Sequence, residues 1–484
     1  MIFETVIGLE VHLQLRTNTK IFCGCANQFG ESPNTRTCPV CLGLPGSLPV
    51  FNAKALEYAL KTGLALNCEI NPQFKFDRKN YFYPDLTKAY QISQFDQPVC
   101  RQGELIIPGD GGAAKKIRIN RAHLEEDAGK LIHDDARNCS LADYNRAGTP
   151  LLEIVTEPDL RSSQEAYEYL RILKLTLSYL DVSDCDMEKG SLRCDANVSI
   201  RAPGDAKLGT KTELKNMNSF KAVKAAIDYE VNRQRAVILG GQRVVQETRL
   251  WDENKAMTFS MRSKEEAHDY RYFPEPDLPL VTVPEEVVEE MRQTLPELPQ
   301  AKMERFTQTY GISVYDAGVL AQDRLTAGFF EQCAALYPEA KKICNWLNGD
   351  VLKEMNERKI TVAASTLQPE DLVDLIRKIE EGAVSQLKAK DVLKIMLDSG
   401  KNCSAIIAEQ GWGQVSNDEE LLKIAQQALA DNPATVAQIR EGKLSAIGFL
   451  VGQAMQKSGG KANPKKIKEL IEKNLQAGAD GKPF

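Results

Sequence analysis

The residues of this chain best suited to bind a metal ion together with an anion lie in one alternating segment, 190–220. Its two halves, LRCDANVSIR and KTELK, each place polar side chains at every second position, which is the pattern of a half-buried strand. The polar positions that could bind a cation or an anion are Arg193, Asp195, Asn197, Arg201, Lys211, Glu213 and Lys215. A turn rich in Gly and Pro separates the halves, so we expect a hairpin. Its polar face fits a site for a hard cation and an anion, or an ordinary solvated sheet surface.

Two further stretches carry groups that could bind a cation. The segment 4–15 alternates like a strand and places Glu10 and His12 on its polar face. A His two residues from a Glu suits a divalent cation, although a single strand His is more often structural. Glu125, within the run HLEED, follows a strand-like start, where acids either hold hard cations or face solvent.

Four cysteines form two close pairs separated by twelve residues. They are Cys23, Cys25, Cys38 and Cys41, and they lie among Gly, Pro, Asn and Thr without hydrophobic periodicity. Two thiolate pairs around a short loop are typical of a tetrahedral zinc site that holds a loop too small to fold by itself. Only one residue separates Cys23 from Cys25, whereas two to four residues are commoner between paired zinc ligands. The two pairs still lead us to expect a structural Zn²⁺ rather than free thiols.

An aromatic-rich run, FDRKNYFYPDL at 76–86, surrounds Lys79. Aromatic rings beside cations can stack on a nucleobase, but buried aromatics in a loop are equally common. The composition does not choose between these interpretations.

Strands and helices must position these groups. Helices are expected at 53–64, 165–180 and 220–239 among the strands, whereas helical patterns dominate after a Pro-rich stretch near 281–299. The fold class predicted is α+β: an N-terminal antiparallel-sheet catalytic domain with flanking helices and a zinc-stapled loop, followed by two all-α domains. The expected domains are 1–293, 294–407 and 408–484.

The C-terminal region is basic although the chain is acidic. Residues 440–484 carry nine Lys or Arg against four Asp or Glu, in a chain of net charge −6. The basic helical tail indicates RNA binding, against the alternative that its lysines only solvate a helix. The candidate RNA-binding residues are Lys457, Lys461, Lys465, Lys466 and Lys468.

Composition is that of an ordinary globular protein, with 43% hydrophobic and 26% charged residues. The first apolar run contains Glu4 and Glu10, and nowhere do 18 uncharged apolar residues follow one another. We therefore expect no export signal and no membrane partner. Twelve cysteines, eight of them scattered, suit a reducing cytoplasm.

The motifs together resemble a known family, the B subunits of tRNA-dependent aspartyl/glutamyl amidotransferases. The resemblance covers nearly the whole chain and is carried by long motifs: IGLEVHLQL, the two cysteine pairs, RKNYFYPDL, KAYQISQ, HLEEDAGK, DYNRAGTPLLEIVTEPD, GSLRCDANVSIR, TELKNMNSF, MRSKEEAHDYRYFPEPDL and AIGFLVGQAMQKSGGKANPKKIKELI.

The resemblance implies an ATP-dependent reaction within a complex of three subunits. An amidase (A) subunit would release ammonia from glutamine, and a small C subunit would brace the assembly. The B subunit would phosphorylate the side-chain carboxylate of mischarged Glu-tRNA(Gln) or Asp-tRNA(Asn), and ammonia would then displace phosphate. Either acid side chain meets the same chemistry, so the sequence leaves the choice of tRNA open.

The resemblance also assigns roles to residues at the matching motifs. The implied catalytic, Mg²⁺-binding groups are Glu10, His12, Glu125, Asp195 and Glu213. The implied ATP and phosphate ligands are Lys79, Arg193, Asn197, Lys211 and Lys215. The chain has no G-x-x-x-x-G-K-[ST] and no G-x-G-x-x-G motif, which argues against a P-loop or a Rossmann turn as the ATP site.

Two functions from other classes compete with this interpretation. A non-catalytic RNA-binding scaffold would explain the zinc loop and the basic tail, but would not need metal-type residues on two strands. A stand-alone metallohydrolase would explain the acids but would not need the basic tail.

Overall fold

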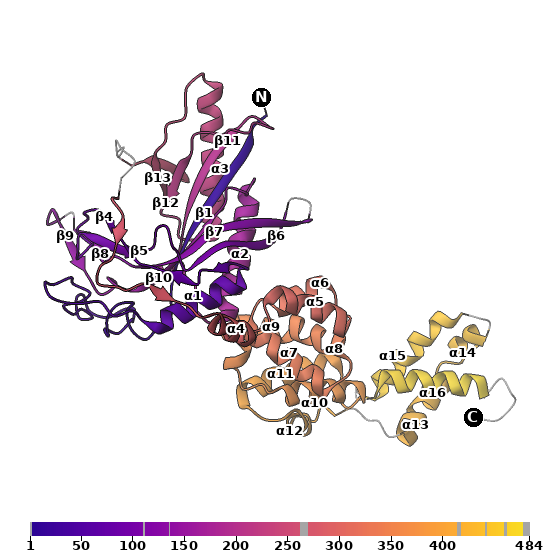
Figure 1. The fold of residues 1–484 in the computed structure, drawn as a ribbon. Coiled ribbons are helices and arrows are strands. Elements are labelled where there is room, and N and C mark those ends of the chain that lie inside the picture. The colour runs from indigo at the N-terminus through magenta and orange to yellow at the C-terminus, as the bar shows by residue number, and fades with distance from the viewer. Residues whose placement is uncertain are drawn as a thin grey trace. The chain divides into compact units, whose positions relative to one another are not determined.

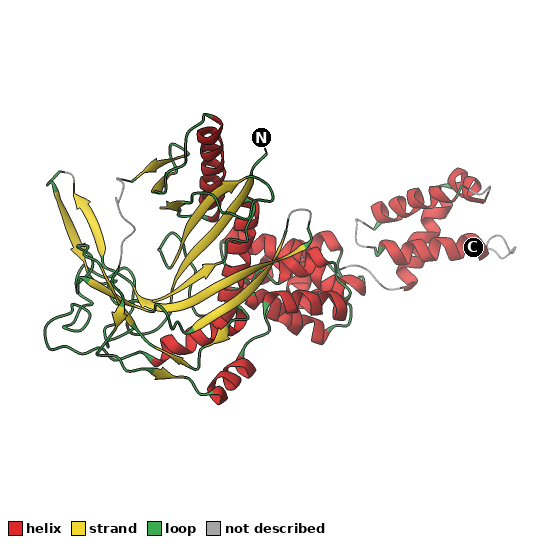
Figure 2. Ribbon diagram, turned by 45° about the horizontal axis from the view of Figure 1, so that its top comes forward, coloured by secondary structure: helices red, strands yellow, loops and turns green. Residues whose placement is uncertain are grey.

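The computed structural model describes residues 2–109, 112–134, 136–261, 270–413, 418–440, 443–458 and 462–477. By contacts it divides into two compact units, Met1–Leu298 and Pro299–Phe484. Among these described residues, strands occur only in the first unit, while the second is helical (Figures 1 and 2). The predicted α+β class is confirmed.

The main sheet of the first unit contains nine strands among the described residues, in the order β14-β13-β12-β11-β1-β10-β7-β6-β2. Their bounds are β1 (Glu4–Gln14), β2 (Glu69–Ile70), β6 (Cys100–Pro108), β7 (Ala114–Glu126), β10 (Pro150–Thr156), β11 (Leu192–Arg201), β12 (Thr212–Lys215), β13 (Thr248–Asp252) and β14 (Met257–Ser260). Neighbours pair antiparallel, as expected, except that β12 and β13 run parallel. The pairing of β11 with β12 confirms the predicted hairpin.

Smaller sheets border this one. Among the described residues, β3 (Gln73–Phe74) pairs with β16 (Val281–Thr282), and β8 (Lys130–Asp134) pairs with β9 (Cys139–Asp143). The strand β4 (Asp77–Asn80) lies between β15 (Phe273–Pro274) and β5 (Tyr90–Ser93). The aromatic-rich run therefore begins as a strand and ends as a loop.

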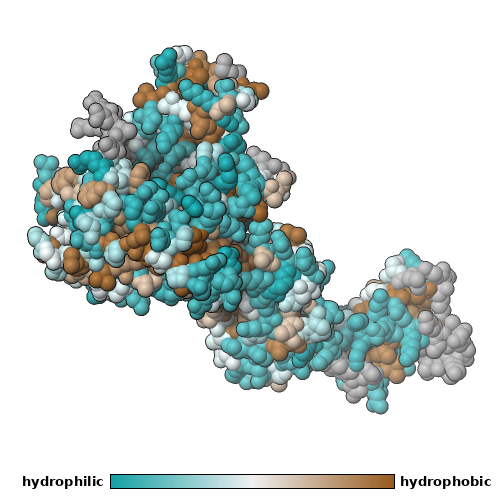
Figure 3. All heavy atoms as spheres, viewed as in Figure 1, coloured by the Kyte–Doolittle hydropathy of each residue, from teal (hydrophilic) through white to brown (hydrophobic). Residues whose placement is uncertain are grey.

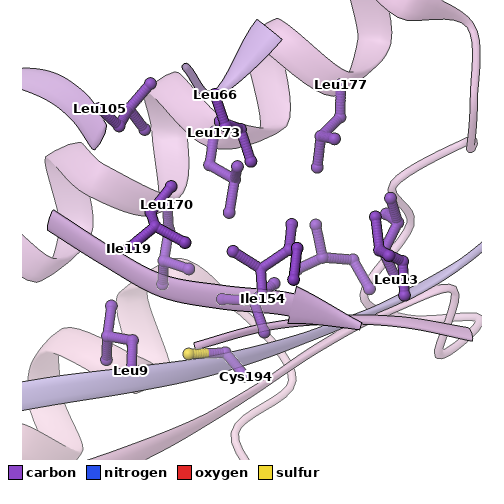
Figure 4. Close-up of a cluster of buried hydrophobic side chains, with 14 of the residues drawn as sticks. Leu9, Leu13, Leu66, Leu105, Ile119, Ile154, Leu170, Leu173, Leu177 and Cys194 are labelled. Carbon is purple, nitrogen blue, oxygen red and sulfur yellow. The ribbon is translucent and has the colours of Figure 1, made fainter. Parts of the chain in front are cut away.

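The apolar face of the main sheet packs against helices, and this contact forms the core. Leu9 and Leu13 of β1, together with Ile154 of β10, are fully buried, because alternate residues of a strand share one face. Leu170, Leu173 and Leu177 of α2 (Ser163–Leu180) lie over them (Figure 4). The opposite face of the same strands is left to the polar residues.

The predicted helices of the first unit are confirmed. They are α1 (Ala53–Ala65), α2 and α3 (Phe220–Leu239), and α4 (Glu285–Thr294) follows near the end of the unit. The side chains of Ser162 and Ser219 cap α2 and α3 by accepting hydrogen bonds from the first-turn amides of Glu165 and Ala222. Each of these two helices is therefore preceded directly by a Ser that serves as its N-cap.

The described residues of the second unit form two separate clusters of buried hydrophobic side chains. The first involves helices between residues 299 and 410, and the second involves those between 418 and 477. The bounds are α5 (Pro299–Tyr310), α6 (Val314–Leu320), α7 (Arg324–Leu336), α8 (Ala340–Trp346), α9 (Leu352–Arg358), α10 (Pro369–Glu380), α11 (Gln386–Ser399), α12 (Cys403–Gln410), α13 (Asp418–Ala430), α14 (Pro433–Arg440), α15 (Ile447–Lys457) and α16 (Pro464–Ala477), with short π or 3-10 turns at Leu347–Val351, Val362–Ala364 and Leu444–Ala446.

Hydrophilic residues predominate on the face shown in Figure 3, with hydrophobic residues scattered between them. Within the part of the chain that is described, no helix has both the length and the apolar character needed to span a bilayer.

Candidate active site and metal centres

The pairing register of four central strands sets the polar face of the sheet. His12 on β1 lies opposite Glu153 on β10, and Glu153 lies opposite His123 on β7. On the other side of β1, Glu10 lies opposite Asp195 of β11. Since directly opposed residues share a face, the register brings acids and imidazoles from all four strands together.

The first metal-type cluster consists of His12, Glu125 and Glu153, whose candidate ligand atoms all lie within 4.8 Å of one another. Nε2 of His12 is 3.5 Å from Glu153 and 3.8 Å from Glu125. The buried His123 contacts both carboxylates as well, at 3.3 Å from Glu153 and 3.6 Å from Glu125. The two acids are therefore held between two imidazoles.

This arrangement shifts the pKa values of its members. Burial lowers the pKa of His12, but a hydrogen bond to Glu153 and the charges of Glu153 and Glu125 outweigh burial and raise it to about 9. Burial would raise the pKa of Glu153, yet His123 and His12 hold it well below its ordinary value. The carboxylates stay ionised, so a divalent cation can take the place of a proton on His12.

The second cluster consists of Glu10, Asp195 and Glu213, from β1, β11 and β12, with ligand atoms again within 4.8 Å. The ammonium of Lys215 lies 2.5 Å from Asp195 and 3.1 Å from Glu213. The side-chain amide of Asn197 donates a hydrogen bond of 2.8 Å to Glu10. Three acids held by one lysine and one amide form a compact set of oxygen donors, which is what Mg²⁺ prefers.

Charge repulsion is present in this second cluster. Burial raises the pKa of Glu10, and the charges of Glu153 and Glu213 raise it further. Burial also acts to raise the pKa of Glu213, but Lys215 and a hydrogen bond from Thr248 lower it overall. A cation bound here would relieve the repulsion at Glu10, which makes these residues a good fit for a metal ion.

The structure brings together the four acids and the one imidazole expected from the sequence, but divides them into two adjacent clusters. It adds Glu153 and His123, which the sequence analysis did not single out. The signal for Glu153 was a lone acid in the apolar strand PLLEIVT. His123 alternates with Glu125 along β7, so the period-two rule already placed it on the same face.

The expected phosphate-binding cations take different positions. Arg193 forms an ion pair of 2.9 Å with the buried Asp127, and Lys211 is exposed just before β12. The ammonium of Lys79 lies 4.8 Å from the ring centre of Tyr270. Burial opposes its charge, but Glu125 and other neighbours raise the pKa of Lys79 overall. Lys79 is thus a charged group next to the first cluster.

The four cysteines Cys23, Cys25, Cys38 and Cys41 converge, with all their sulfur atoms within 4.8 Å of one another. The backbone N–H of Cys38 donates a hydrogen bond to Sγ of Cys41 at 3.1 Å. A hydrogen bond from the Cys23 thiol lowers the pKa of Cys41, and Lys20 lowers it further. A convergent set of four sulfurs fits Zn²⁺.

The buried Lys20 supports this fit. Its ammonium lies 3.6 Å from Sγ of Cys41 and donates a hydrogen bond of 2.7 Å to the carbonyl of Arg36. Four thiolates around Zn²⁺ carry a net charge of −2, and a buried cation beside them offsets part of it.

The tail lysines lie on two helices. Lys457, at the end of α15, forms an ion pair with Asp431. On α16, Lys465 and Lys468 are exposed and Lys466 is partly buried, while Ile467 and Ile471 are buried. Lys461 lies outside the described residues.

Comparison with known proteins identifies the family of the chain. Residues 5–289 match the model of the GatB/GatE catalytic domain, and residues 328–475 match that of the GatB domain. Two relatives are the B subunits of the aspartyl/glutamyl-tRNA(Asn/Gln) amidotransferases of Caldanaerobacter subterraneus subsp. tengcongensis and Moorella thermoacetica. The chain is 51% identical to the first and 52% identical to the second, over 98% of this chain and 100% of each relative. It is 51% identical to the corresponding Myxococcus xanthus protein over 98% of both chains.

The catalytic-domain match spans more than half of the chain and contains both acidic clusters and the four cysteines. Because the relatives also align from end to end, the protein belongs to the GatB family of amidotransferase B subunits.

Proposed function

We propose that this chain is the B subunit of a glutamine-dependent amidotransferase that converts Glu-tRNA(Gln), Asp-tRNA(Asn) or both into the cognate amide. The γ-phosphoryl group of ATP would pass to the side-chain carboxylate, giving an acyl phosphate and ADP. Ammonia would then attack the carbonyl carbon. A C–N bond forms, the C–O bond to phosphate breaks, and the nitrogen loses a proton as phosphate leaves.

The two acidic clusters support this proposal because phosphoryl transfer concentrates negative charge. His12, Glu125 and Glu153 would hold one Mg²⁺, and Glu10, Asp195 and Glu213 would hold another. Bound Mg²⁺ supplies neutralisation of charge on the transferring phosphoryl group. The close approach of the ligand atoms within each cluster supports these ligand sets, and the lowered pKa of Glu153 and the raised pKa of Glu10 fit them.

The cations of the same face would orient the phosphates. Lys215 stands between Asp195 and Glu213, so it can reach a phosphate oxygen beside the second cluster. Lys79 lies near Glu125 of the first cluster, and we propose that its ammonium stabilises the negative charge of the acyl phosphate. Arg193 and Asn197 would act by holding Asp127 and Glu10, and the exposed Lys211 would reach outward to ATP.

We infer a division of roles along the chain. Residues 1–293 would carry out the chemistry, with Cys23, Cys25, Cys38 and Cys41 binding a structural Zn²⁺. Residues 294–407 would connect residues 1–293 to the C-terminal region. The basic residues 408–484 would bind the tRNA body through Lys457, Lys461, Lys465, Lys466 and Lys468. An A subunit would supply ammonia, a small C subunit would brace the complex, and the tRNA substrate would place the protein in the cytoplasm.

The observation that carries the proposal is the meeting of two metal-type clusters on one sheet face of a chain in this family. The deciding experiment assembles the chain with its A and C subunits and supplies ATP, Mg²⁺, glutamine and each mischarged tRNA. We expect amidation that requires ATP and the B subunit. ATP turnover without amidation would favour a hydrolase, and tRNA binding without ATP turnover would favour a scaffold.

A further inference from the structure

Phe95 and Tyr272 form a parallel stack at the border of the acidic clusters. Their ring centres are 4.3 Å apart and their planes differ by 10°. Tyr270 meets Tyr272 edge to face at 6.0 Å. Phe95 is 50% exposed, so the pair presents a flat aromatic surface to its surroundings.

The backbone holds the exposed Phe95 in place. Its N–H donates a hydrogen bond of 3.0 Å to Asp77, and its carbonyl accepts one of 3.3 Å from Nη1 of Arg121. Asp77 is itself buried and paired with Lys75. Single exposed aromatics are common on protein surfaces. An exposed aromatic with a fixed backbone and a ring stacked on a second one is preorganised to bind a planar group.

The stack adjoins the proposed chemistry. Arg121, His123 and Glu125 occupy alternate positions of β7 and therefore share the polar face. Burial raises the pKa of the Tyr272 hydroxyl, Lys79 and Arg121 lower it, and Glu125 and Glu153 raise it further. The Tyr272 ring is thus within electrostatic reach of the first cluster and of two cations.

We propose that the exposed face of Phe95 stacks on an adenine ring, so that Phe95, Tyr272 and Arg121 form an adenosine-binding site beside the first acidic cluster. Arg121 is only partly buried, and its guanidinium, which contacts the Phe95 carbonyl, can also donate to a ribose or phosphate oxygen of the same nucleotide. Stacking is tolerant of orientation, and a guanidinium beside it recognises the phosphate.

This inference rests on the proposed function, in which two substrates carry adenosine. One is ATP. The other is the tRNA, whose 3′-terminal adenosine bears the amino acid and must come next to the clusters. The chemistry of recognition is the same for both, so the experiment has to separate them.

The test uses the complete complex with Phe95→Ala. In the ATP arm, the KM for ATP is measured at saturating mischarged tRNA. In the tRNA arm, equilibrium binding is compared for uncharged tRNA with and without its terminal adenosine. Loss of the stacking contact with one base is expected to weaken the binding of the affected substrate about 5- to 100-fold. Phe95→Trp, which keeps an aromatic face, should restore near wild-type values.

A rise in KM for ATP alone identifies the ATP adenine as the ligand. Loss of the preference for tRNA with its terminal adenosine identifies the tRNA end instead. The matched control is Phe259→Ala, because Phe259 is 40% exposed on β14, at the far edge of the sheet, and contacts Lys255. It should leave both quantities unchanged.

Two results would overturn the proposal. The first is an active Phe95→Ala complex with unchanged ATP and tRNA values. The second is a variant that no longer assembles with the A or C subunit, which would make Phe95 a protein contact. If the wild-type complex itself fails to amidate, the proposed function fails, and this outcome differs from either result.

Discussion

Nε2 of His12 lies 3.5 Å from Oε2 of Glu153, and the two residues stand directly opposite each other on β1 and β10. Glu153 also contacts His123 on its other side, so one buried carboxylate is shared by imidazoles from two strands. The two imidazoles hold the pKa of Glu153 well below its ordinary value, and the two acids raise the pKa of His12 to about 9, so a bound cation would replace a proton on His12. Glu153 is therefore the centre of the first cluster.

Glu153→Gln should reduce amidation by the assembled complex by at least about 100-fold, because a ligand charge for the cation that neutralises the phosphoryl group is lost. The measurement is the initial rate of amide formation at saturating ATP and mischarged tRNA. Glu104→Gln is the control, since Glu104 lies on the same sheet but pairs with Lys116 away from the clusters. A wild-type rate in Glu153→Gln would exclude Glu153 as a ligand.

The second cluster makes a separate prediction. Asp195→Asn and Glu213→Gln should each abolish phosphoryl transfer while the fold persists, because both acids are partly exposed and lie on the polar face of the sheet. Each loss is worth several kcal/mol of transition-state stabilisation. ATP consumption dependent on mischarged tRNA measures this step. Any residual activity should need a higher Mg²⁺ concentration; an unchanged rate and Mg²⁺ requirement would contradict the assignment.

The cysteine site should contain one Zn²⁺ per chain that stabilises the loop without taking part in the reaction. Elemental analysis of protein purified without chelator measures the content. Cys25→Ser should lose zinc and lower the thermal midpoint, whereas Cys139→Ser, which alters an exposed cysteine outside the cluster, should keep both. Wild-type protein free of zinc would refute the site.

The ion pair of Asp127 with Arg193 makes a prediction about how the stability of the fold depends on pH. It is buried, and although burial raises its pKa, Arg193 and Arg146 lower it overall. An acid whose folded pKa is lowered stabilises the fold above its unfolded pKa of about 4, and this contribution disappears as the pH falls through the folded pKa. Asp127→Asn should therefore lower the free energy of unfolding at pH 7 by about 3 kcal/mol.

The difference in the free energy of unfolding between wild type and Asp127→Asn should stay constant from about pH 5 to 8 and shrink below about pH 4. Urea unfolding of the full chain across this range measures it. Asp181→Asn is the control, since the Arg16–Asp181 pair is also close, at 2.7 Å, but exposed, and should contribute less than about 1 kcal/mol. A difference that grows on acidification would contradict the pKa direction.

Local patterns in the sequence predicted much of this site. Period-two alternation placed Glu10 and His12 on one face of β1, and the same rule predicted the hairpin that carries Asp195 and Glu213. These features depend on residues close together in sequence. The four cysteines were likewise found by their spacing.

The division of the acids into two clusters depends on long-range register, which no local pattern encodes. The order of the sheet inserts β10 between β1 and β7, and this brings Glu153 between His12 and His123. One residue of register shift would turn Glu153 to the apolar face. Similarly, the Phe95–Tyr272 stack joins segments 177 positions apart in the chain, and their contact is fixed by tertiary packing.

The basic tail should separate tRNA affinity from chemistry. Lys465 and Lys468 are exposed on α16, whereas Lys457 is already paired with Asp431. Deleting residues 418–484 should raise the KM for mischarged tRNA and flatten its salt dependence, by roughly one in the log–log slope for each lost phosphate contact. Glutamine hydrolysis by the A subunit without tRNA should be unchanged, because that reaction lies elsewhere.

A charge-reversal variant tests whether the change in KM and salt slope comes from the charge of the lysines. Lys465→Glu with Lys468→Glu should reproduce part of the change in KM and slope, while Lys423→Glu, an exposed position on α13, should leave both near wild type. The turnover number at saturating tRNA should stay constant, because these lysines position the tRNA body and the sheet acts on the aminoacyl end. An unchanged KM and salt slope in the truncated complex would limit tRNA recognition to residues 1–417.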